Sequence, residues 1–556
     1  DGLFWKNQYE AFQQFFHEKN LAPYFGSIDS LTRAMGDVSF DHQGRRIQGM
    51  RMQNTGDVYA VNGWEAMPYD NHSGIVDIYR NCKGNPSTFT YYTQPLYVAV
   101  SPRTQFVHLP GKVPVDFYIV NEKNLSGKYR LSVFVCTPDG KEGKHIEKEV
   151  HITGGDCFGQ LLLEHCQLEI EGVSGLYQVK AQLRNASGHL CAEGKDEVLG
   201  IYWDKKQLKG KGALYGTPDD PVATFYQKAT GCELPAFHSD IEKLDWIVVT
   251  RSSLDAPQPV PVEAFCQKEG KSVLELSLYK DDDLRTLAGV TQDNKIDRTF
   301  ADGAQPDPLL PANQSFSAIW DGKLKAPQSG TYMIGVTSDQ GMRLSVNGQR
   351  IVDEWRNNKE LTVVRPFLLK AGDEVAVRVE YSQRNPTGSV QLVWSLPDHA
   401  AIAPQELLDR VKEDGTSLLL LKSAESWMDA VSAYTGSAYH GYYSVGKNWV
   451  GGVHFVKEHP LFNGLPVNVA MGWPYQALVR NGDRRLGLHI DNEELVAGSY
   501  GSAPFNLGSA VGIISCGKGK IYYSTLDLVD NLNNPAAAAD VARKLFCNFI
   551  LLSKDR

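Results

Sequence analysis

The sequence predicts a multidomain protein of mixed α and β structure. Its 556 residues suffice for three to four domains at about 150 residues per domain. Short segments that alternate apolar and polar residues recur in two stretches, and this pattern is typical of β-sandwiches. Residues 245–250 instead form a continuous apolar run, which predicts a buried parallel strand flanked by helices. We therefore expect two β-sandwiches, an α/β domain and, at the start of the chain, a unit in which helices precede a strand.

The composition excludes several classes of protein. Hydrophobic residues make up 42% and charged residues 22% of the chain, which is ordinary for globular domains. The net charge of −9 comes without a basic stripe, so nucleic acid and anionic membranes are not expected partners. The nine cysteines lie far apart with no CxxC pair, which predicts neither a disulfide framework nor a zinc ribbon. No apolar run approaches the roughly 18–20 residues of a membrane span.

The first part of the chain has the pattern of the end of a (β/α)₈ barrel. Helical periodicity covers residues 9–17, 30–35 and 41–53. The apolar run Asp57–Trp64 follows and predicts a buried strand, after which comes a polar, aromatic loop. In such barrels the chemistry sits on loops that follow the carboxyl ends of the strands. Two strands and three helices cannot close a barrel, so the remaining strands would precede Asp1.

Residues 57–86, with the helix at 44–57 before them and residues 91–100 after them, resemble the last βα unit of family 2 glycoside hydrolases. The likeness is to the large bacterial enzymes of the β-galactosidase type. It implies that residues 1–95 are the C-terminal part of the barrel and that Trp64 floors a sugar subsite. The family's two catalytic glutamates lie on earlier strands, upstream of this chain. Two Asn-Glu pairs in the chain, at Glu122 and Glu493, do not match the family setting, and no catalytic residue is assigned.

The loop after the expected strand is the candidate substrate-binding site. An aromatic face can stack on a pyranose ring, while carboxylate and amide groups take its hydroxyls in pairs. An ordinary polar loop that caps a strand is the alternative interpretation. A direct catalytic role for one carboxylate, with a second as its partner, is a further alternative, because a glycosidase needs two carboxyl groups about 5–9.5 Å apart. The substrate-binding residues are Trp64, Glu65, Asp70, Asn71 and His72, of which Glu65 and Asp70 would form that pair.

Residues 96–205 are predicted to form an immunoglobulin-like β-sandwich. Short alternating strands recur there at the spacing of such folds, with turn residues between them. The glycosidase resemblance places the same module after the barrel, where it would act in spacing and packing. The expected strands are residues 115–120, 129–136, 159–163 and 176–182.

An α/β domain is expected in two pieces, residues 206–279 and 399–556. Residues 245–250 and 271–276 predict parallel strands, and a helix–turn–strand pattern returns at 404–421. Residues 511–525, followed by the amphipathic helix 536–552, resemble the glutamine-amidotransferase-like domain appended to such glycosidases. Cys516 lacks the Gly-x-Cys-x-Gly elbow of an amidotransferase nucleophile, and no histidine follows it. We interpret it as a buried structural cysteine.

Residues 280–398 form the expected insertion. Five ordered motifs between residues 315 and 374 resemble a protective-antigen-type, lectin-like β-sandwich. Such lectins can hold Ca²⁺ through two adjacent aspartates, but here the pair is Asp339-Gln340, so no lectin-type calcium site is expected. If the insertion binds sugar, exposed aromatics such as Trp320 or Trp355 would stack on the glycan. A purely structural spacer is the alternative.

An aromatic–proline loop with two histidines remains, and we interpret it as packing rather than as a sugar platform. It contains His454, His459, Trp473 and Tyr475. Zinc motifs, phosphate loops and GxSxG elbows are absent from the sequence. Accordingly, no metal site and no cofactor are predicted.

The resemblances together imply the C-terminal part of a retaining exo-β-glycosidase, β-galactosidase-like, that acts on β-linked oligo- or polysaccharides. Its protein partner would be the N-terminal portion of the same enzyme. Assembly with a second copy of the chain is left open by the sequence. A non-catalytic carbohydrate-binding or scaffold protein is the alternative function. Family members that degrade polysaccharides are commonly exported, which implies a periplasmic or extracellular location.

Overall fold

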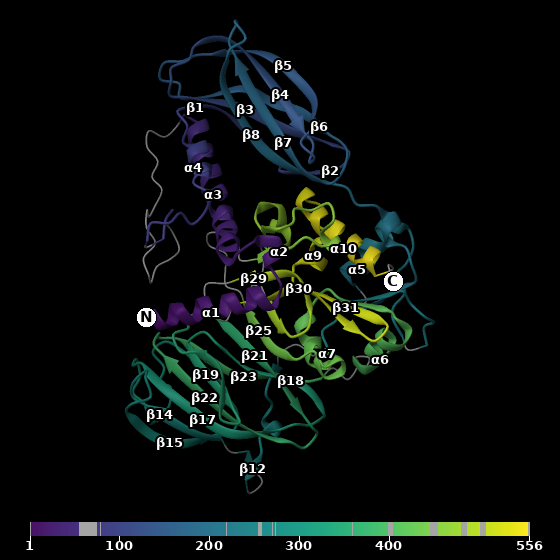
Figure 1. Ribbon diagram of the computed structural model, residues 1–556. Helices are drawn as coiled ribbons and strands as arrows, with labels where there is room; N and C mark the ends of the chain where they lie inside the picture. Colours follow the sequence, from purple (N-terminus) through teal and green to yellow (C-terminus); the bar gives the residue numbers. More distant parts are fainter. Residues whose placement is uncertain are drawn as a thin grey trace. The chain divides into compact units, whose positions relative to one another are not determined.

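The computed structural model describes most of the chain as helices and strands arranged in two compact units (Figure 1). The described residues are 2–54, 75–77, 79–217, 219–238, 240–253, 258–268, 271–272, 274–358, 360–397, 404–444, 454–479, 486–500 and 507–553. One unit comprises residues 1–251, 405–425 and 431–556, and the other comprises residues 252–404 and 426–430. The mixed α+β class expected from the sequence is confirmed. None of the helices in the described ranges is long and apolar enough to cross a membrane.

The first unit begins with four helices, α1 (Gly2–Glu18), α2 (Ala22–Phe25), α3 (Ile28–Met52) and α4 (Ser87–Tyr92). The sequence predicted two helices where α3 runs without a break. Gly36 lies within this helix and against the backbone of Lys83, where a Cβ would come within 1.9 Å of the carbonyl oxygen. The expected strand Asp57–Trp64 lies outside the described residues. The (β/α)₈ barrel is therefore still a prediction.

A β-sandwich of two sheets follows the helices. One sheet has the order β1-β3-β6 and the other β2-β8-β7-β4-β5, and all pairs except β2–β8 are antiparallel. All four strands expected in this stretch are found, within β3, β4, β6 and β7. Aliphatic residues from both sheets form the core. The strands are β1 (Leu96–Pro102), β2 (Phe106–His108), β3 (Gly111–Asn121), β4 (Gly127–Cys136), β5 (Glu142–Ile152), β6 (Gly159–Ile170), β7 (Gly175–Arg184) and β8 (Leu190–Ile201).

The rest of the first unit is a mixed sheet covered by helices. Four parallel strands lie side by side in the order β31-β24-β10-β9, and antiparallel strands extend the sheet beyond β31. All residues of β10 and β24 are buried, as expected for parallel strands with both faces covered. The parallel strands are β9 (Gly212–Tyr215), β10 (Trp246–Val249), β24 (Ser417–Leu420) and β31 (Gly519–Ser524). The antiparallel strands are β25 (Tyr439–Ser444), β26 (His454–Val456), β27 (Val469–Ala470), β28 (Leu486–Ile490), β29 (Glu494–Tyr500) and β30 (Leu507–Cys516).

Helices pack on this sheet through one large apolar cluster. The cluster joins Trp246 and Leu419 of the sheet to Phe225 and Phe546 of two helices. The helices of this region are α5 (Pro221–Thr230), α6 (Pro404–Asp409), α7 (Met428–Thr435), α8 (Gln476–Val479), α9 (Leu528–Asn531) and α10 (Asp540–Leu552). The helix predicted at residues 536–552 is confirmed as α10.

The second unit is another antiparallel β-sandwich, hereafter the second sandwich (residues 258–397). Its six-stranded sheet has the order β15-β14-β17-β22-β19-β20, and its five-stranded sheet contains β11-β23-β18-β21 with β16 beside β23. The strands are β11 (Gln258–Pro259), β14 (Leu274–Tyr279), β15 (Leu287–Asp293), β16 (Asp297–Phe300), β17 (Phe316–Lys325), β18 (Gly330–Ser338), β19 (Gly341–Val346), β20 (Gln349–Glu354), β21 (Leu361–Leu369), β22 (Glu374–Gln383) and β23 (Gly388–Ser395), and a short hairpin pairs β12 (Gln267–Lys268) with β13 (Lys271–Ser272).

One strand prediction was wrong. Residues 271–276 were expected as a parallel strand of the α/β domain, but β14 pairs antiparallel with β15 and β17 in the second sandwich. The burial of β14 alternates along the strand, with Leu274, Leu276 and Leu278 facing the core. An alternating apolar run is typical of a sheet with one covered face, and the short length of this run hid the alternation.

Candidate functional site

The predicted sugar-binding loop cannot be compared with the structure. Trp64, Glu65, Asp70, Asn71 and His72 all lie outside the described residues. Their assignment as a substrate-binding site stays a prediction. The candidate site that the structure does describe lies elsewhere, in the second sandwich.

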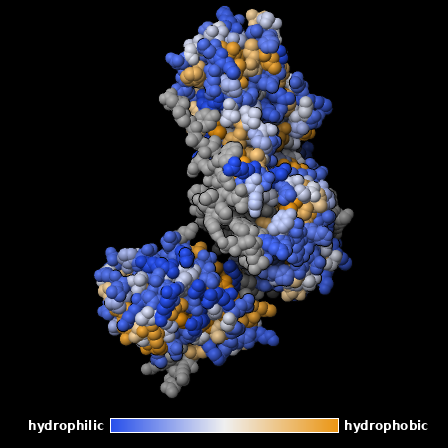
Figure 2. Space-filling model, turned by 60° about the vertical axis from the view of Figure 1, so that its left-hand side comes forward, coloured by the Kyte–Doolittle hydropathy of each residue, from blue (hydrophilic) through white to orange (hydrophobic). Residues whose placement is uncertain are grey.

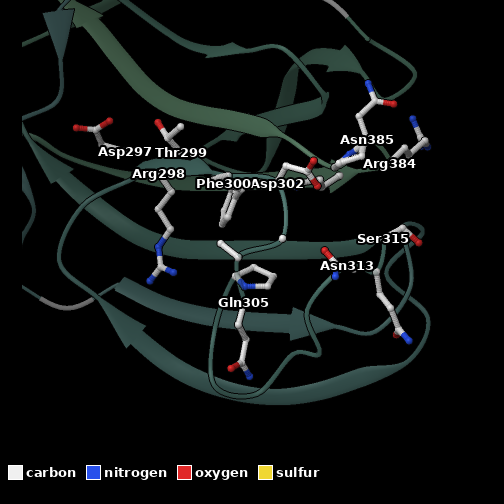
Figure 3. A pocket seen from close by; sticks show the side chains of 17 residues that line it. Asp297, Arg298, Thr299, Phe300, Asp302, Gln305, Asn313, Ser315, Arg384 and Asn385 are labelled. Atoms are coloured by element: carbon white, nitrogen blue, oxygen red, sulfur yellow. The ribbon is translucent and has the colours of Figure 1, made fainter.

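A cavity of about 810 Å³ opens at one edge of the second sandwich (Figure 3). Its walls are β16, the loop 301–315 that joins β16 to β17, and the turn 383–386 between β22 and β23. Loops as long as 301–315 are uncommon in compact domains and are usually functional. We call this cavity the loop pocket.

Aromatic packing and one buried leucine hold the loop in place. Phe300, the last residue of β16, packs edge-on against Phe316 with ring centroids 5.0 Å apart and stacks on Tyr381 at 5.5 Å. Further along the loop, the Leu310 side chain is inserted into the core of the sandwich. The Gln305 amide donates to the Leu310 carbonyl oxygen at 2.9 Å, which braces the loop across the insertion. The loop is therefore anchored at its start and at its middle, while most of its remaining side chains are exposed to solvent.

The polar side chains that line the loop pocket fall into two groups. Asp302, Asn313, Gln314, Ser315 and Asn385 are exposed, and among the described residues none of these side chains is hydrogen-bonded to another part of the protein. In Figure 3, Asp302, Arg384 and Asn385 gather on one side of the pocket, with Asn313 and Ser315 across from them. Their amide and carboxylate groups can donate to and accept from hydroxyl groups of a ligand.

The second group is charged and already paired. Arg298 donates through Nε to Asp293 at 2.8 Å. Arg384 donates through Nε to Asp282 at 2.9 Å and through a terminal nitrogen to the Trp355 carbonyl oxygen at 2.8 Å.

Asp297, at the far wall of the pocket, belongs to the same group. It pairs with Lys295 and accepts from Gln391, each at 3.0 Å, and these two bonds lower the pKa of its carboxyl group. The ion pairs and hydrogen bonds of these charged side chains therefore hold the pocket wall in place.

The turn Asp339-Gln340 supports the pocket from behind. Gln340 is buried, and its amide donates to the Thr387 carbonyl oxygen at 3.1 Å while its Oε1 accepts from the Arg384 backbone nitrogen at 3.2 Å. Asp339 accepts from the backbone nitrogen of Ser389 at 2.6 Å. Gln340 therefore ties the turn 383–386 to the end of β18 with neutral hydrogen bonds.

This arrangement does not fit a lectin-type calcium ion. A hard cation needs several oxygen ligands clustered around it, and a carboxylate pair usually supplies them. At the position of the second carboxylate, Gln340 has instead an amide nitrogen that donates to Thr387 and an oxygen that already accepts from Arg384. Asp339 likewise already accepts a hydrogen bond from a backbone nitrogen.

The two tryptophans expected to stack on glycan do not face solvent. Trp320 is 1% exposed, lies in the core and donates through its indole nitrogen to Asp293 at 3.1 Å. Trp355 is 9% exposed, and the Arg343 guanidinium covers its ring at 4.3 Å from the centroid. That prediction was wrong, because Trp320 stands at an inward position of β17 and the Trp355 ring is covered by a charged side chain.

The remaining candidate residues are structural. Cys516 is buried at the end of β30, next to the tight turn into β31, and burial raises the pKa of its thiol, so the structural interpretation is confirmed. Tyr475 and His454 are buried, and Trp473 packs edge-on against Phe106 at 5.5 Å, which confirms that this loop serves packing. His459 accepts from the Leu461 backbone nitrogen at 3.1 Å and caps a helical turn.

The glutamates of the two Asn-Glu pairs also have partners in the structure. Glu122 forms an ion pair of 2.5 Å with Arg51. Glu493 is fully buried, pairs with Lys19 at 2.7 Å and accepts from the hydroxyls of Ser509 and Tyr523. Burial raises the pKa of Glu493. This cluster joins the segment after α1 to the mixed sheet, and every polar group in it already has a partner.

Comparison with known proteins assigns the second sandwich to a class. Residues 270–407 match the family model of the PA14 domain, and these residues are a minor part of the chain. The β-rich insertion expected from the sequence is therefore a PA14 domain.

Individual relatives cover limited parts of the chain. Anti-sigma-I factor RsgI3 of Acetivibrio thermocellus is 29% identical over 117 residues, which are 21% of this chain and 18% of that protein. Among solved structures, a β-glucosidase from Kluyveromyces marxianus is 16% identical, with a TM-score of 0.22 over 40% of this chain and 29% of that one. A PA14 sugar-binding domain from an RTX adhesin is 19% identical, with a TM-score of 0.17 over 22% of this chain and 87% of that one. At these scores the solved structures define no common fold for the whole chain.

Sequence reasoning missed the loop pocket. Its walls come from residues 297–306, 313–315 and 383–386, which the antiparallel pairing of β17 with β22 and of β16 with β23 brings together. One signal was available: the stretch 301–315 contains three prolines and has no periodicity. Such a stretch predicts a long loop, although it does not predict what the loop faces.

Proposed function

We propose that the second sandwich binds carbohydrate in the loop pocket. The observation that carries this proposal is the set of unpaired amide, hydroxyl and carboxylate groups around an open cavity in a PA14 domain. Pyranose hydroxyls are recognised by such groups in pairs, because each hydroxyl both donates and accepts. The volume of about 810 Å³ suits an oligosaccharide rather than a single small ion.

Supporting bonds favour a preformed site. Phe300, Leu310 and Gln340 fix the two walls through core packing and buried hydrogen bonds. A preformed pocket spends less conformational entropy on binding than a loop that must order around its ligand. Because Gln340 replaces the second aspartate of a lectin-type calcium site and its amide is already hydrogen-bonded, we expect binding without calcium.

For the whole chain, we propose the C-terminal part of an exo-β-glycosidase, β-galactosidase-like, that acts on β-linked oligo- or polysaccharides outside the cytoplasm. The support is the family 2 resemblance of residues 44–100 and the sugar-binding loop expected around Trp64. In this proposal the catalytic glutamates lie on an upstream portion, and the PA14 domain binds the polymer. Among the described residues, Glu122 and Glu493 are each committed to a basic partner, which agrees with this assignment.

A non-catalytic carbohydrate-binding or scaffold protein is the second candidate. It is favoured by the curated relative, which shares a stretch of sequence with this chain and is named as an anti-sigma factor rather than as an enzyme. The two candidates share the loop pocket and differ in whether any part of the protein cleaves a glycosidic bond.

Binding is tested with two pocket variants and a matched control. Asn385→Ala and Gln314→Ala each remove one exposed amide from the pocket, and Gln349→Ala removes an exposed amide from β20, outside it. Each pocket variant should weaken retention on β-linked polysaccharide about fivefold, the effect of one hydrogen bond worth about 1 kcal/mol. The control should bind like the unaltered chain. Equal binding by all variants would contradict the assignment of the pocket.

Catalysis is tested separately with aryl β-glycosides. The chain alone should not hydrolyse them, because the proposed glutamates are upstream. With an upstream portion added, activity should appear, and Trp64→Ala should lower it at least about tenfold through the loss of a stacking floor. Turnover by the chain alone that Glu65→Gln abolishes would make Glu65 catalytic and overturn this part of the proposal.

A further inference from the structure

We infer that the loop pocket selects neutral glycans and rejects glycans that carry carboxylate or sulfate groups. This inference rests on the proposed carbohydrate binding and narrows it to a ligand class. It follows from the charges around the pocket, from the pairing of its two arginines and from the chemistry of the side chains left unpaired.

The charged groups in and around the pocket carry more negative than positive charge. The lining itself is balanced, with Asp297 and Asp302 against Arg298 and Arg384. The ion-pair partners of these residues add one cation, Lys295, and three carboxylates: Asp282, Asp293 and Asp307. Excess negative charge around a site repels an anionic ligand at the distance of first encounter and after binding.

Neither arginine is available for an acidic sugar. Recognition of a carboxylate usually uses two parallel N–H groups of one guanidinium. In Arg384, Nε already donates to Asp282 and a terminal nitrogen already donates to the Trp355 carbonyl oxygen. Arg298 donates to Asp293, and a second aspartate, Asp307, lies 3.9 Å from it. To turn toward a ligand, either guanidinium would leave an aspartate without its partner.

The unpaired side chains suit hydroxyl groups instead. Asn313, Gln314 and Asn385 each offer a donor and an acceptor, which is the pattern that a sugar hydroxyl presents in return. Asp302 can only accept, so it can hold two neighbouring hydroxyls but cannot bind a carboxylate. Asp302 and Asn385 both line the pocket, so a ligand held by the Asn385 amide is also exposed to the negative charge of Asp302.

The described arginines of the six-stranded sheet form no basic patch that would attract an anionic glycan. In Figure 2 the visible face of the second sandwich is largely hydrophilic, with smaller hydrophobic areas. The arginines of the six-stranded sheet are also paired with acidic residues: Arg343 with Asp353 at 2.8 Å, and Arg378 with Asp321 at 2.8 Å. These pairs present compensated charge to the solvent rather than a basic stripe.

The test uses sets of three matched ligands with the full chain. Each set contains a neutral β-linked trisaccharide of the gluco, galacto or manno series, the same trisaccharide oxidised at C6 of its terminal residue to the uronate, and the methyl ester of that uronate. Calorimetric titrations at low salt should give at least about tenfold weaker binding for the uronate than for the neutral parent, which equals 1.4 kcal/mol. The methyl ester should recover the affinity, because it restores neutrality while C6 stays at the oxidation level of the uronate.

Two variants separate charge from contact. Asp302→Asn should improve binding of the uronate about threefold relative to the neutral ligand, since it removes one exposed negative charge. Asn385→Ala should weaken the neutral ligand and the methyl ester alike, and Gln349→Ala should change neither. A uronate that binds as tightly as its neutral parent would overturn the inference while leaving carbohydrate binding intact. The absence of binding by every ligand in all three series would instead overturn the proposed function.

Discussion

The two β-sandwiches of this chain share a framework and differ in their loops. In the first sandwich, short turns such as residues 122–126, 137–141 and 171–174 join neighbouring strands. In the second sandwich, one connection lengthens to residues 301–315 and forms a wall of the loop pocket. The comparison teaches that the framework alone makes no binding site. A site arises where a long loop is anchored to the core and keeps polar side chains unpaired.

The cores also differ in chemistry. Valine, leucine and isoleucine fill most of the first core. In the second core, aromatic residues form a connected group around Tyr381 that includes Trp320, Phe300 and Phe316. The aromatic group holds the start of the loop 301–315 in place, because Phe300, a member of the group, is the last residue of β16 before the loop. Stability and site geometry are therefore coupled in the second sandwich.

Removing the largest core ring should have the largest effect. Trp320→Ala should lower the free energy of unfolding of the second sandwich by about 3–5 kcal/mol, because it leaves a cavity in the aromatic core and removes one of the two side-chain donors to Asp293 Oδ2. Trp320→Phe should retain most of the stability and all of the glycan binding. Urea unfolding and glycan titration measure the two quantities. Lost binding in a stable Trp320→Phe protein would show that the indole itself contacts the ligand.

Acidification should lower the stability of the first unit more than that of the second. Burial lowers the pKa of His489, in β28 of the first unit, from 6.5 to about 4. Between pH 6.5 and about 4 the unfolded chain therefore binds a proton at His489 that the folded unit does not bind. The contribution of the neutral His489 to the free energy of unfolding is full above pH 6.5 and is lost as the pH falls toward 4. The expected loss is about 2–3 kcal/mol. Residues 258–397 contain no histidine, so the second sandwich should not share it.

Calorimetric unfolding at pH 7 and pH 4.5 measures this difference. His489→Gln should flatten the pH dependence of the transition of the first unit and leave the other transition unchanged. Parallel shifts of both transitions in the variant and in the unaltered chain would contradict the assignment to His489.

The smallest expected effect concerns a feature that the sandwiches share. Tyr177 donates from its hydroxyl to the backbone carbonyl oxygens of Glu171 or Val173, at 2.9 and 2.7 Å. Tyr332 donates to the carbonyl oxygen of Gln328 at 2.8 Å. Both bonds tie a strand to the chain just before it, as in a tyrosine corner. Tyr177→Phe and Tyr332→Phe should each lower the free energy of unfolding by about 1 kcal/mol, measured in urea. An effect in only one sandwich would show that the frameworks are not equivalent.

Sequence patterns predicted the framework better than the site. The strands of the first sandwich could be predicted because β7, for example, alternates buried and half-buried residues over its whole length. The run at β14 was too short for its alternation to decide between a parallel and an antiparallel strand. The continuous helix α3 was not predicted, because the local pattern indicated helix only at residues 30–35 and 41–53.

Burial and long-range contacts explain the errors in the site. Tryptophan is suited both to a core and to a sugar platform, and only the inward register of Trp320 on β17 decides between them. The loop pocket combines residues near 300 with residues near 384, a contact set by the pairing of β17 and β22. No local pattern records that pairing. The loop around Trp64 was chosen for its composition and stays a prediction.

Amide hydrogen exchange of the full chain, with and without a neutral β-linked oligosaccharide, tests the central claim most directly. Bound ligand should slow exchange in residues 301–315 and 383–386, because these segments form the loop pocket. The turns of the first sandwich at 122–126 and 137–141 should exchange equally fast in both samples. Protection confined to the first sandwich, or to residues 353–358 of the second, would contradict the claim that the loop pocket is the carbohydrate site.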